Sequence, residues 1–301
     1  MKTTEDEEMD GLRPNIARQP RAAIIIDAPK VKVPRVTKEK LFSNIMLLIF
    51  GLLFVIPLLW LFLASFDKQA TLAIQWPHFT LSNFQQILTS GNLHSLISSF
   101  ELSIIATVIA TIPGTFAAYA FSRRHIPWKG PWLLVILFLT GVPITVMIIP
   151  VYQIFVKANL LSMIPAAIFL GVTSMPLEIW IIKNFIDAVP KDLEESAAIE
   201  QASTLQILRR IVLPLAIPGI GAAAIFGFVN AWGSFLIPLV LISNPTQQPG
   251  PVTIYNYIGA STVHYGEIAA FSLVYSVPVV LLYLLLGKGL RGGFLFGGAT
   301  K

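Results

Sequence analysis

One charged stretch interrupts long apolar segments of the chain: VPKDLEESAAIEQASTLQILRRIVLPLAIP, from Val189 to Pro218. Pro190 suits the first turn of a helix, where its missing N–H is no loss. Carboxylates in that turn complement the positive end of the helix dipole, and Glu194 and Glu195 follow closely. Apolar residues then recur at roughly helical spacing, at Leu193, Ala197, Ala198, Ala202 and Leu205. The stretch therefore predicts a short amphipathic helix that is well placed to receive a partner protein.

The composition around this stretch is too apolar for an ordinary soluble protein. Of the 301 residues, 55% are hydrophobic and 12% are charged, and the mean hydropathy is +0.73. Soluble domains average about 25% charged residues. The chain has no cysteine, which excludes disulfides, thiol catalysis and cysteine-ligated metal sites. The composition indicates a polytopic membrane protein.

Six apolar segments are long enough to cross a bilayer, which takes roughly 20 apolar residues. Proline and glycine inside them predict kinked, tightly packed helices, and the spacing of Gly219, Ala223 and Gly227 predicts a close helix contact. The predicted spans are Leu41 to Phe66, about Leu102 to Phe121, Pro131 to about Val156, about Ile164 to Ile186, about Ile211 to Ile242, and Ile268 to about Leu286.

Lysine and arginine are unevenly distributed between the two sides of the predicted spans. One side carries only Lys68 and Lys157. The other carries the N-terminal bases and Arg123, Arg124, Lys129, Lys183, Lys191, Arg209, Arg210, Lys288, Arg291 and Lys301. By the positive-inside rule, both termini and the charged stretch are cytoplasmic. This placement also accounts for the net charge of +5 without a nucleic-acid partner.

The charged stretch resembles a motif in the membrane subunits of binding-protein-dependent ABC importers: E-A-A, three residues, G, nine residues, I-x-L-P. Here Glu195-Ser196-Ala197 is followed at the same spacing by Gln201 and by Ile211-Val212-Leu213-Pro214. The preceding residues 190–194 resemble the sugar-importer branch. In the family the glycine marks a turn between two short helices. Because a left-handed glutamine costs on the order of 1 kcal/mol, we expect either a differently made turn at Gln201 or two helices that run on.

This resemblance implies an all-α fold, namely six transmembrane helices with a cytoplasmic coupling helix, the fold of ABC type I importer permeases. We expect a largely disordered cytoplasmic extension in residues 1–40, the permease domain in 41–290 with its coupling helix at about 190–210, and a cytoplasmic tail in 291–301. The coupling helix would dock on an ATPase through Glu194, Glu195, Ser196, Ala197, Ala198, Glu200, Gln201, Ala202 and Leu205.

The resemblance also implies a function and a set of partners. The chain would be a permease subunit of the plasma or inner membrane, similar to the second permease of maltose-type systems, and would import a carbohydrate-type solute. Its partners would be a homologous permease, two ATPase subunits and an extracytoplasmic binding protein. ATP and Mg would be bound by the ATPase, since this chain lacks a G-x-x-x-x-G-K-[ST] loop. Its four histidines stand far apart, without metal-binding spacing, so we expect no enzyme activity, cofactor or metal on this chain.

Several residues within the spans are candidates for contact with the solute. Glu178 lies inside the fourth span, and intramembrane carboxylates are functional candidates by default. Asn230, Trp232 and Phe235 lie late in the fifth span, where the family has a tryptophan-centred motif, although helix packing is the favoured interpretation there. Glu101 begins the second span and fits the outer membrane interface.

The outer loop from Asn244 to His264 is the counterpart of a loop that reaches the binding protein in related importers. The residues expected to face that protein are Asn244, Pro245, Gln247, Gln248, Pro249 and Gly250, and a plain turn is the alternative. Two other functions stay open. One is an ABC importer for a non-sugar solute such as glycerol phosphate. The other is an ion-coupled secondary transporter, which needs intramembrane ion ligands and usually inverted repeats.

Overall fold

The computed structural model describes residues 38–89, 92–258 and 263–297. The predicted disordered extension therefore lies outside the described residues, apart from 38–40, and so do the last four residues of the tail. The chain divides into two units, and the helical bundle described below belongs to the second unit, which starts at Leu53.

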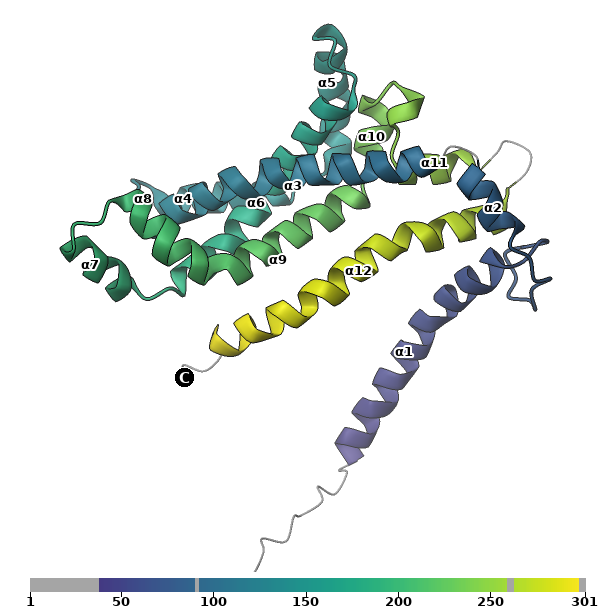
Figure 1. The fold of residues 1–301 in the computed structure, drawn as a ribbon, viewed down its shortest axis with the longest axis horizontal. Helices are drawn as coiled ribbons and strands as arrows, with labels where there is room; N and C mark the ends of the chain where they lie inside the picture. Colours follow the sequence, from purple (N-terminus) through teal and green to yellow (C-terminus); the bar gives the residue numbers. More distant parts are fainter. Residues whose placement is uncertain (1–37, 90–91, 259–262, 298–301) are drawn as a thin grey trace, which may run out of the picture. The chain divides into compact units, whose positions relative to one another are not determined.

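The described residues form helices joined by short turns (Figure 1). The α-helices are α1 (Lys38–Ser65), α2 (Ser82–Thr89), α3 (Asn92–Arg123), α4 (Lys129–Thr140), α5 (Ile144–Lys157), α6 (Met163–Asp187), α7 (Lys191–Ile199), α8 (Thr204–Ile207), α9 (Leu213–Trp232), α10 (Leu236–Leu241), α11 (Gly250–Asn256) and α12 (Tyr265–Gly297). A π-helical turn, Leu208–Val212, joins α8 to α9, and a 3-10 turn, Pro245–Gln247, precedes α11.

Five of the described helical segments are long and apolar enough to cross a membrane. The pair α4 and α5 makes a sixth if it is counted as one span, although its two halves are bent by 88°. The all-α polytopic fold predicted from the sequence is confirmed.

Three spans, α3, α6 and α9, pack against one another and form the centre of the bundle (Figure 1). Small residues let their backbones approach closely. At the contact between α3 and α6, a Cβ added to Gly171 would lie 2.6 Å from the Ala106 carbonyl oxygen. The predicted stripe of Gly219, Ala223 and Gly227 is buried on α9, which confirms its packing role.

The start of one predicted span is wrong, whereas another span has its predicted ends and a sharp bend inside it. Helix α3 begins at Asn92 rather than near Leu102, because serines in its first turns are buried and bond to the helix backbone. Hydropathy does not register such residues as part of a span. The predicted span from Pro131 to Val156 agrees with the ends of α4 and α5 to within two residues. It is bent between these helices at Gly141 and Pro143, residues from which a kink was predicted.

The fifth span also differs from its prediction. Its helical path begins at Thr204 rather than Ile211 and is interrupted after Trp232. Pro238, one of the prolines inside this predicted span, lies in the first turn of α10, a position that tolerates proline. The loop after α10 contains the helix α11, and α12 continues to Gly297, beyond the predicted end at Leu286.

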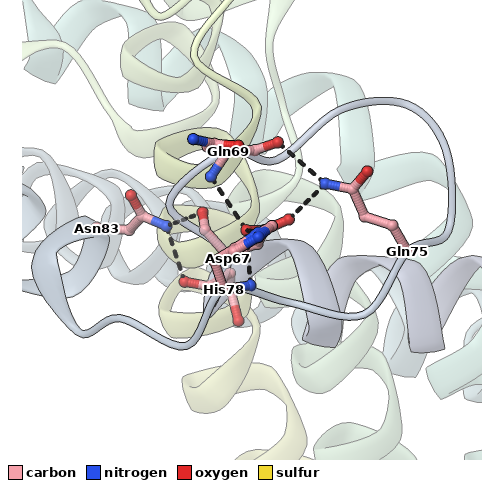
Figure 2. Close-up of polar contacts among 6 residues, drawn as sticks. Asp67, Gln69, Gln75, His78 and Asn83 are labelled. Carbon is pink, nitrogen blue, oxygen red and sulfur yellow. Dashed lines mark hydrogen bonds and ion pairs between the residues drawn. The ribbon is translucent and has the colours of Figure 1, made fainter.

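The loop after α1 is organised around a buried carboxylate (Figure 2). Asp67 is 2% exposed, and it accepts hydrogen bonds from the backbone N–H groups of Gln69 and His78, each at 3.0 Å, and from the Gln75 amide at 2.7 Å. The Asn83 amide donates to the carbonyl oxygens of Ser65 and Asp67. These bonds fix residues 67–79 as an ordered cap on the end of the first span.

Candidate functional site

The charged stretch forms two short helices at one end of the bundle, where its pattern predicts a single amphipathic helix. Helix α7 begins after Pro190 and carries Asp192 and Glu194 in its first turn, where they complement the helix dipole. Helix α8 begins at a capping box, in which Ser203 and Gln206 each accept a backbone N–H bond from the other.

The turn between these helices is made at Gln201. Its φ of 61° lies in the left-handed region, and the N–H groups of Gln201 and Ala202 bond to the carbonyls of Ala198 and Ala197, both at 3.0 Å. The sequence led us to expect a different turn or continuous helices, and both expectations are wrong. The turn keeps its left-handed residue because these two bonds satisfy the last carbonyls of α7.

The second helix of the segment stands on a packed base. Ile207, Leu208 and Val212 are buried against Ile182 and Ile186 of α6, and they continue directly into α9. Ala197 and Ala202 are partly buried against the same cluster. Helix α8 is therefore packed against α6 and is continuous with α9.

The exposed surface of this segment combines apolar and acidic side chains. Glu195, Ser196, Ala198, Glu200 and Gln201 are exposed. Leu205 is 66% exposed, and so are two apolar residues that the predicted docking set leaves out, Leu193 at 46% and Ile199 at 81%. Ile199 stands inside the motif itself, beside the polar Glu200. A large apolar side chain at that place was the sequence signal that could have added it to the docking set.

Glu194 lies differently from its neighbours. Its side chain is 13% exposed, and its Oε1 pairs with Arg123 Nε at 2.5 Å. It therefore faces the end of α3 rather than the open surface of the segment. From the sequence, Arg123 indicates only the orientation of the chain in the membrane. Its role at this contact could not be found from the motif, since 71 positions separate the two residues.

Glu178 lies in the centre of the three-helix contact. It is fully buried, and the Thr111 hydroxyl of α3 donates to its Oε2 at 2.6 Å. Its Oε1 faces Gly227 of α9 and has no hydrogen-bond partner within the described part of the chain. In this conformation, Glu178 joins helices and is closed off from any solute.

Trp232 is a packing residue, as was favoured from the sequence. It is 4% exposed and stacks on Tyr275 of α12, with ring centres 4.6 Å apart. Its indole N–H donates to the Tyr275 carbonyl, and the Tyr275 hydroxyl donates to the Trp232 carbonyl. Phe235 is half-buried beside Tyr255, whereas Asn230 is exposed on α9.

The loop residues expected to face a binding protein fall into two groups. Asn244 and Pro245 are exposed, and Gln247 and Gln248 are half-buried. Pro249 and Gly250 are buried, and the Gly250 N–H donates to the Ser99 hydroxyl at 2.8 Å. The first four are available to a partner, while the last two tie the loop to α3.

No group of three or more histidine, aspartate or glutamate side chains that could hold a metal ion occurs within residues 38–89, 92–258 and 263–297. The arrangement is suited to docking and movement, since its exposed residues lie on short helices that continue into packed spans.

Comparison with known proteins gives consistent results. Residues 110–291 match the family described as "binding-protein-dependent transport system inner membrane component". The chain is 31% identical to the sulfoquinovosyl glycerol transport system permease protein SmoH of Agrobacterium fabrum, over 80% of this chain and 87% of that protein. It is 32% identical to the trehalose transport system permease protein SugB of Mycobacterium tuberculosis, over 82% of this chain and 92% of that protein.

A solved structure shares the fold. It is a crystal structure of a bacterial ABC transporter involved in the import of the acidic polysaccharide alginate, with a TM-score of 0.69. The match covers 82% of this chain and 95% of that chain at 18% identity.

Proposed function

The chain belongs to the family of inner membrane components of binding-protein-dependent transport systems, and from this we propose that it forms half of the pathway by which an ATP-driven importer moves a carbohydrate-type solute. It is a permease subunit, and ATP is hydrolysed on a separate subunit. The proposal extends to the docking residues, the orientation and the solute class.

The observation that carries the docking assignment is the surface of α7 and α8. Ile199 and Leu205 present large aliphatic side chains beside the exposed carboxylates of Glu195 and Glu200. Burial of such a side chain is worth about 1.5–3 kcal/mol, so a partner that covers them gains affinity. We assign this surface to the ATPase. Its smaller or partly buried residues are Ser196, Ala198, Gln201, Ala197 and Ala202, which a partner can approach closely. Glu194 does not belong to this exposed surface, because its carboxylate pairs with Arg123 of α3.

The distribution of lysine and arginine supports a cytoplasmic position for this surface and for both termini. We propose a homologous permease as the second half of the pathway, two ATPase copies that bind ATP and Mg, and an extracytoplasmic binding protein. The exposed Asn244 and Pro245, on the opposite side in this topology, are then available to the binding protein.

The solute class rests on the relatives. Two that match over most of the chain are named for the transport of trehalose and of sulfoquinovosyl glycerol, and both names describe glycosides. Within this chain, Asn230 is an exposed amide on a membrane span. Because a polar side chain is expensive against lipid, we propose that it faces the pathway, where it can bond to a solute hydroxyl.

The mechanism follows from the continuity of the segment with the spans. Closure of the ATPase dimer on ATP moves α7 and α8, and α9 moves with them because α8 runs into it. Transport requires that ATPase contacts differ between the two states, since a ligand shifts an equilibrium only by its differential affinity.

Charge reversal at the exposed surface tests the docking assignment. Glu195→Lys should abolish ATP-driven uptake in proteoliposomes and weaken copurification with the ATPase. Lys157→Glu is a matched reversal at the exposed end of α5 and should keep copurification intact. Normal uptake by the Glu195→Lys transporter would refute the assignment.

The solute class is tested on the complete transporter with its binding protein. Uptake of radiolabelled disaccharides and glycosides should require ATP and should compete within that class. Uptake of glycerol 3-phosphate alone would refute the carbohydrate assignment and leave the importer assignment standing. Uptake driven by an ion gradient without ATP would refute both.

A further inference from the structure

Three segments of the chain meet at Arg123, the last residue of α3. Its Nε donates to Glu194 of α7 at 2.5 Å. Its Nη2 donates to the carbonyls of Ile186 and Val189 at 2.9 and 2.7 Å, and its Nη1 donates to the Ser122 hydroxyl at 3.1 Å. One guanidinium therefore links the end of α3 to the end of α6 and to α7.

This contact is buried, although it lies at the end of the bundle. The side chain of Arg123 is 8% exposed and that of Glu194 is 13% exposed. Exposed ion pairs contribute little because water screens them. Charge-assisted hydrogen bonds that are largely shielded from water are stronger, and the planar fork of arginine serves several acceptors in fixed directions.

The same contact is reinforced from its other side. The Ser122 hydroxyl donates to Asp187 Oδ1 at 2.5 Å, and Lys183 pairs with Asp187 Oδ2. The end of α3 is thus bonded to the last turn of α6 and to the first turn of α7.

Apolar packing does not fill the space beside this cluster. An open pocket of about 220 Å³ lies among α3, α7 and α8, and Arg123 and Glu194 line it together with Tyr119, Arg124, Lys191 and Thr204. Helix α7 packs mainly on α8 and on the π-helical turn. Polar contacts bridge this pocket between α3 and the docking segment, namely Arg123–Glu194 and the exposed Arg124–Thr204 bond at 3.2 Å.

We propose that Arg123 is a positioning residue for energy coupling, which carries the movement of α7 into α3. The proposal rests on the docking function proposed above. Through α8, the ATPase acts on α9. Through Glu194 and Arg123, it acts on α3 as well, so the two neighbouring spans move together rather than sliding past each other.

Arg123→Ala separates coupling from docking, because the exposed docking surface is unchanged. In the complete transporter in proteoliposomes, we expect copurification with the ATPase and ATP hydrolysis to persist. Solute imported per ATP hydrolysed should fall by about tenfold, which is within the usual range for allosteric coupling. Lys157→Ala, which removes an exposed cation at the end of α5, is the control and should leave that ratio unchanged.

Two further variants keep the test decisive if Arg123→Ala does not assemble. Glu194→Gln retains a side chain of the same shape and all carbonyl contacts of Arg123, and it should lower the ratio. Arg123→Lys retains the charge but not the fork, and it should assemble yet couple poorly. A double-mutant cycle of Arg123→Ala and Glu194→Ala should be strongly non-additive.

The outcomes distinguish this proposal from the function on which it rests. Equal import per ATP for wild type, Arg123→Lys and Glu194→Gln would overturn the positioning role. A parallel loss of assembly and transport in all of these variants, with the ratio unchanged, would assign Arg123 to folding and also overturn it. Absence of ATP-driven uptake by the wild-type transporter would refute the proposed function itself.

Discussion

Gln201 holds a backbone conformation that glutamine rarely adopts, in the middle of the docking segment. The left-handed region costs a residue with a Cβ about 1–2 kcal/mol. Glycine avoids this cost, but it loses more conformational entropy on folding, which lowers stability by about 0.5–1 kcal/mol. Gln201→Gly should therefore raise the free energy of unfolding by about 0.5–1 kcal/mol.

The neighbouring Gln206 provides the control for this prediction. It lies in the right-handed helix α8 and closes the capping box with Ser203. Gln206→Gly should lower the free energy of unfolding by at least about 0.5–1 kcal/mol. Thermal unfolding of both variants in the same detergent measures the contrast, and destabilisation of Gln201→Gly would contradict the left-handed turn.

Asp67 predicts a dependence of stability on pH. Burial raises the pKa of Asp67, but the hydrogen bonds from Gln75, Gln69 and His78 outweigh it and hold the pKa below its usual value of 3.8. The stabilisation is therefore fully present above pH 3.8 and is lost as the pH falls through the lower folded pKa.

Asp67→Asn tests this dependence, because an asparagine amide places its own donor against the donors in the loop. It should destabilise the loop by about 1–3 kcal/mol at neutral pH, and the deficit relative to wild type should shrink in acid. His78 Nδ1 lies 3.6 Å from Asp67, so His78→Gln, which keeps the backbone donor, separates the imidazole's contribution. A deficit that is constant with pH would be inconsistent with an ionised Asp67.

The glycines of α9 predict which helix contacts are tight. A Cβ at Gly227 would collide with the Glu178 carboxylate, whereas a Cβ at Gly221 meets nothing within 4 Å. Gly227→Ala should lower stability by about 1–3 kcal/mol through overpacking, while Gly221→Ala should be neutral or slightly stabilising. Equal unfolding temperatures for the two variants would show that α6 and α9 are not packed as described.

Helix type and the number of apolar segments could be predicted from the sequence, but several helix ends could not. The bend between α4 and α5 and the break after Trp232 fall where glycine and proline occur, yet the same residues lie inside continuous helices elsewhere, as Pro113 does in α3. Whether proline breaks a span depends on the neighbouring helices, which local sequence does not reveal.

The docking segment could be located in the whole chain from one motif, because its spacing is local. The contacts of Glu194 with the bundle could not be predicted, since Arg123, Ser122 and Asp187 come together only when α3 and α6 pack. The same holds for Glu178, which was predicted as a possible pathway residue and is in contact with Thr111 and Gly227 in the folded protein.

The central claim is that α7 and α8 meet the ATPase inside the cell, and the cysteine-free sequence allows a direct measurement. A single cysteine at Ile199 is tested in intact cells with a membrane-impermeant thiol reagent and, in the assembled transporter, with a thiol-specific cross-linker. For the cysteine at Ile199, the account predicts no labelling from outside and a cross-link to the ATPase. For a cysteine at the exposed Trp76 of the opposite loop, it predicts labelling from outside and no cross-link. External labelling at Ile199 without a cross-link would contradict it.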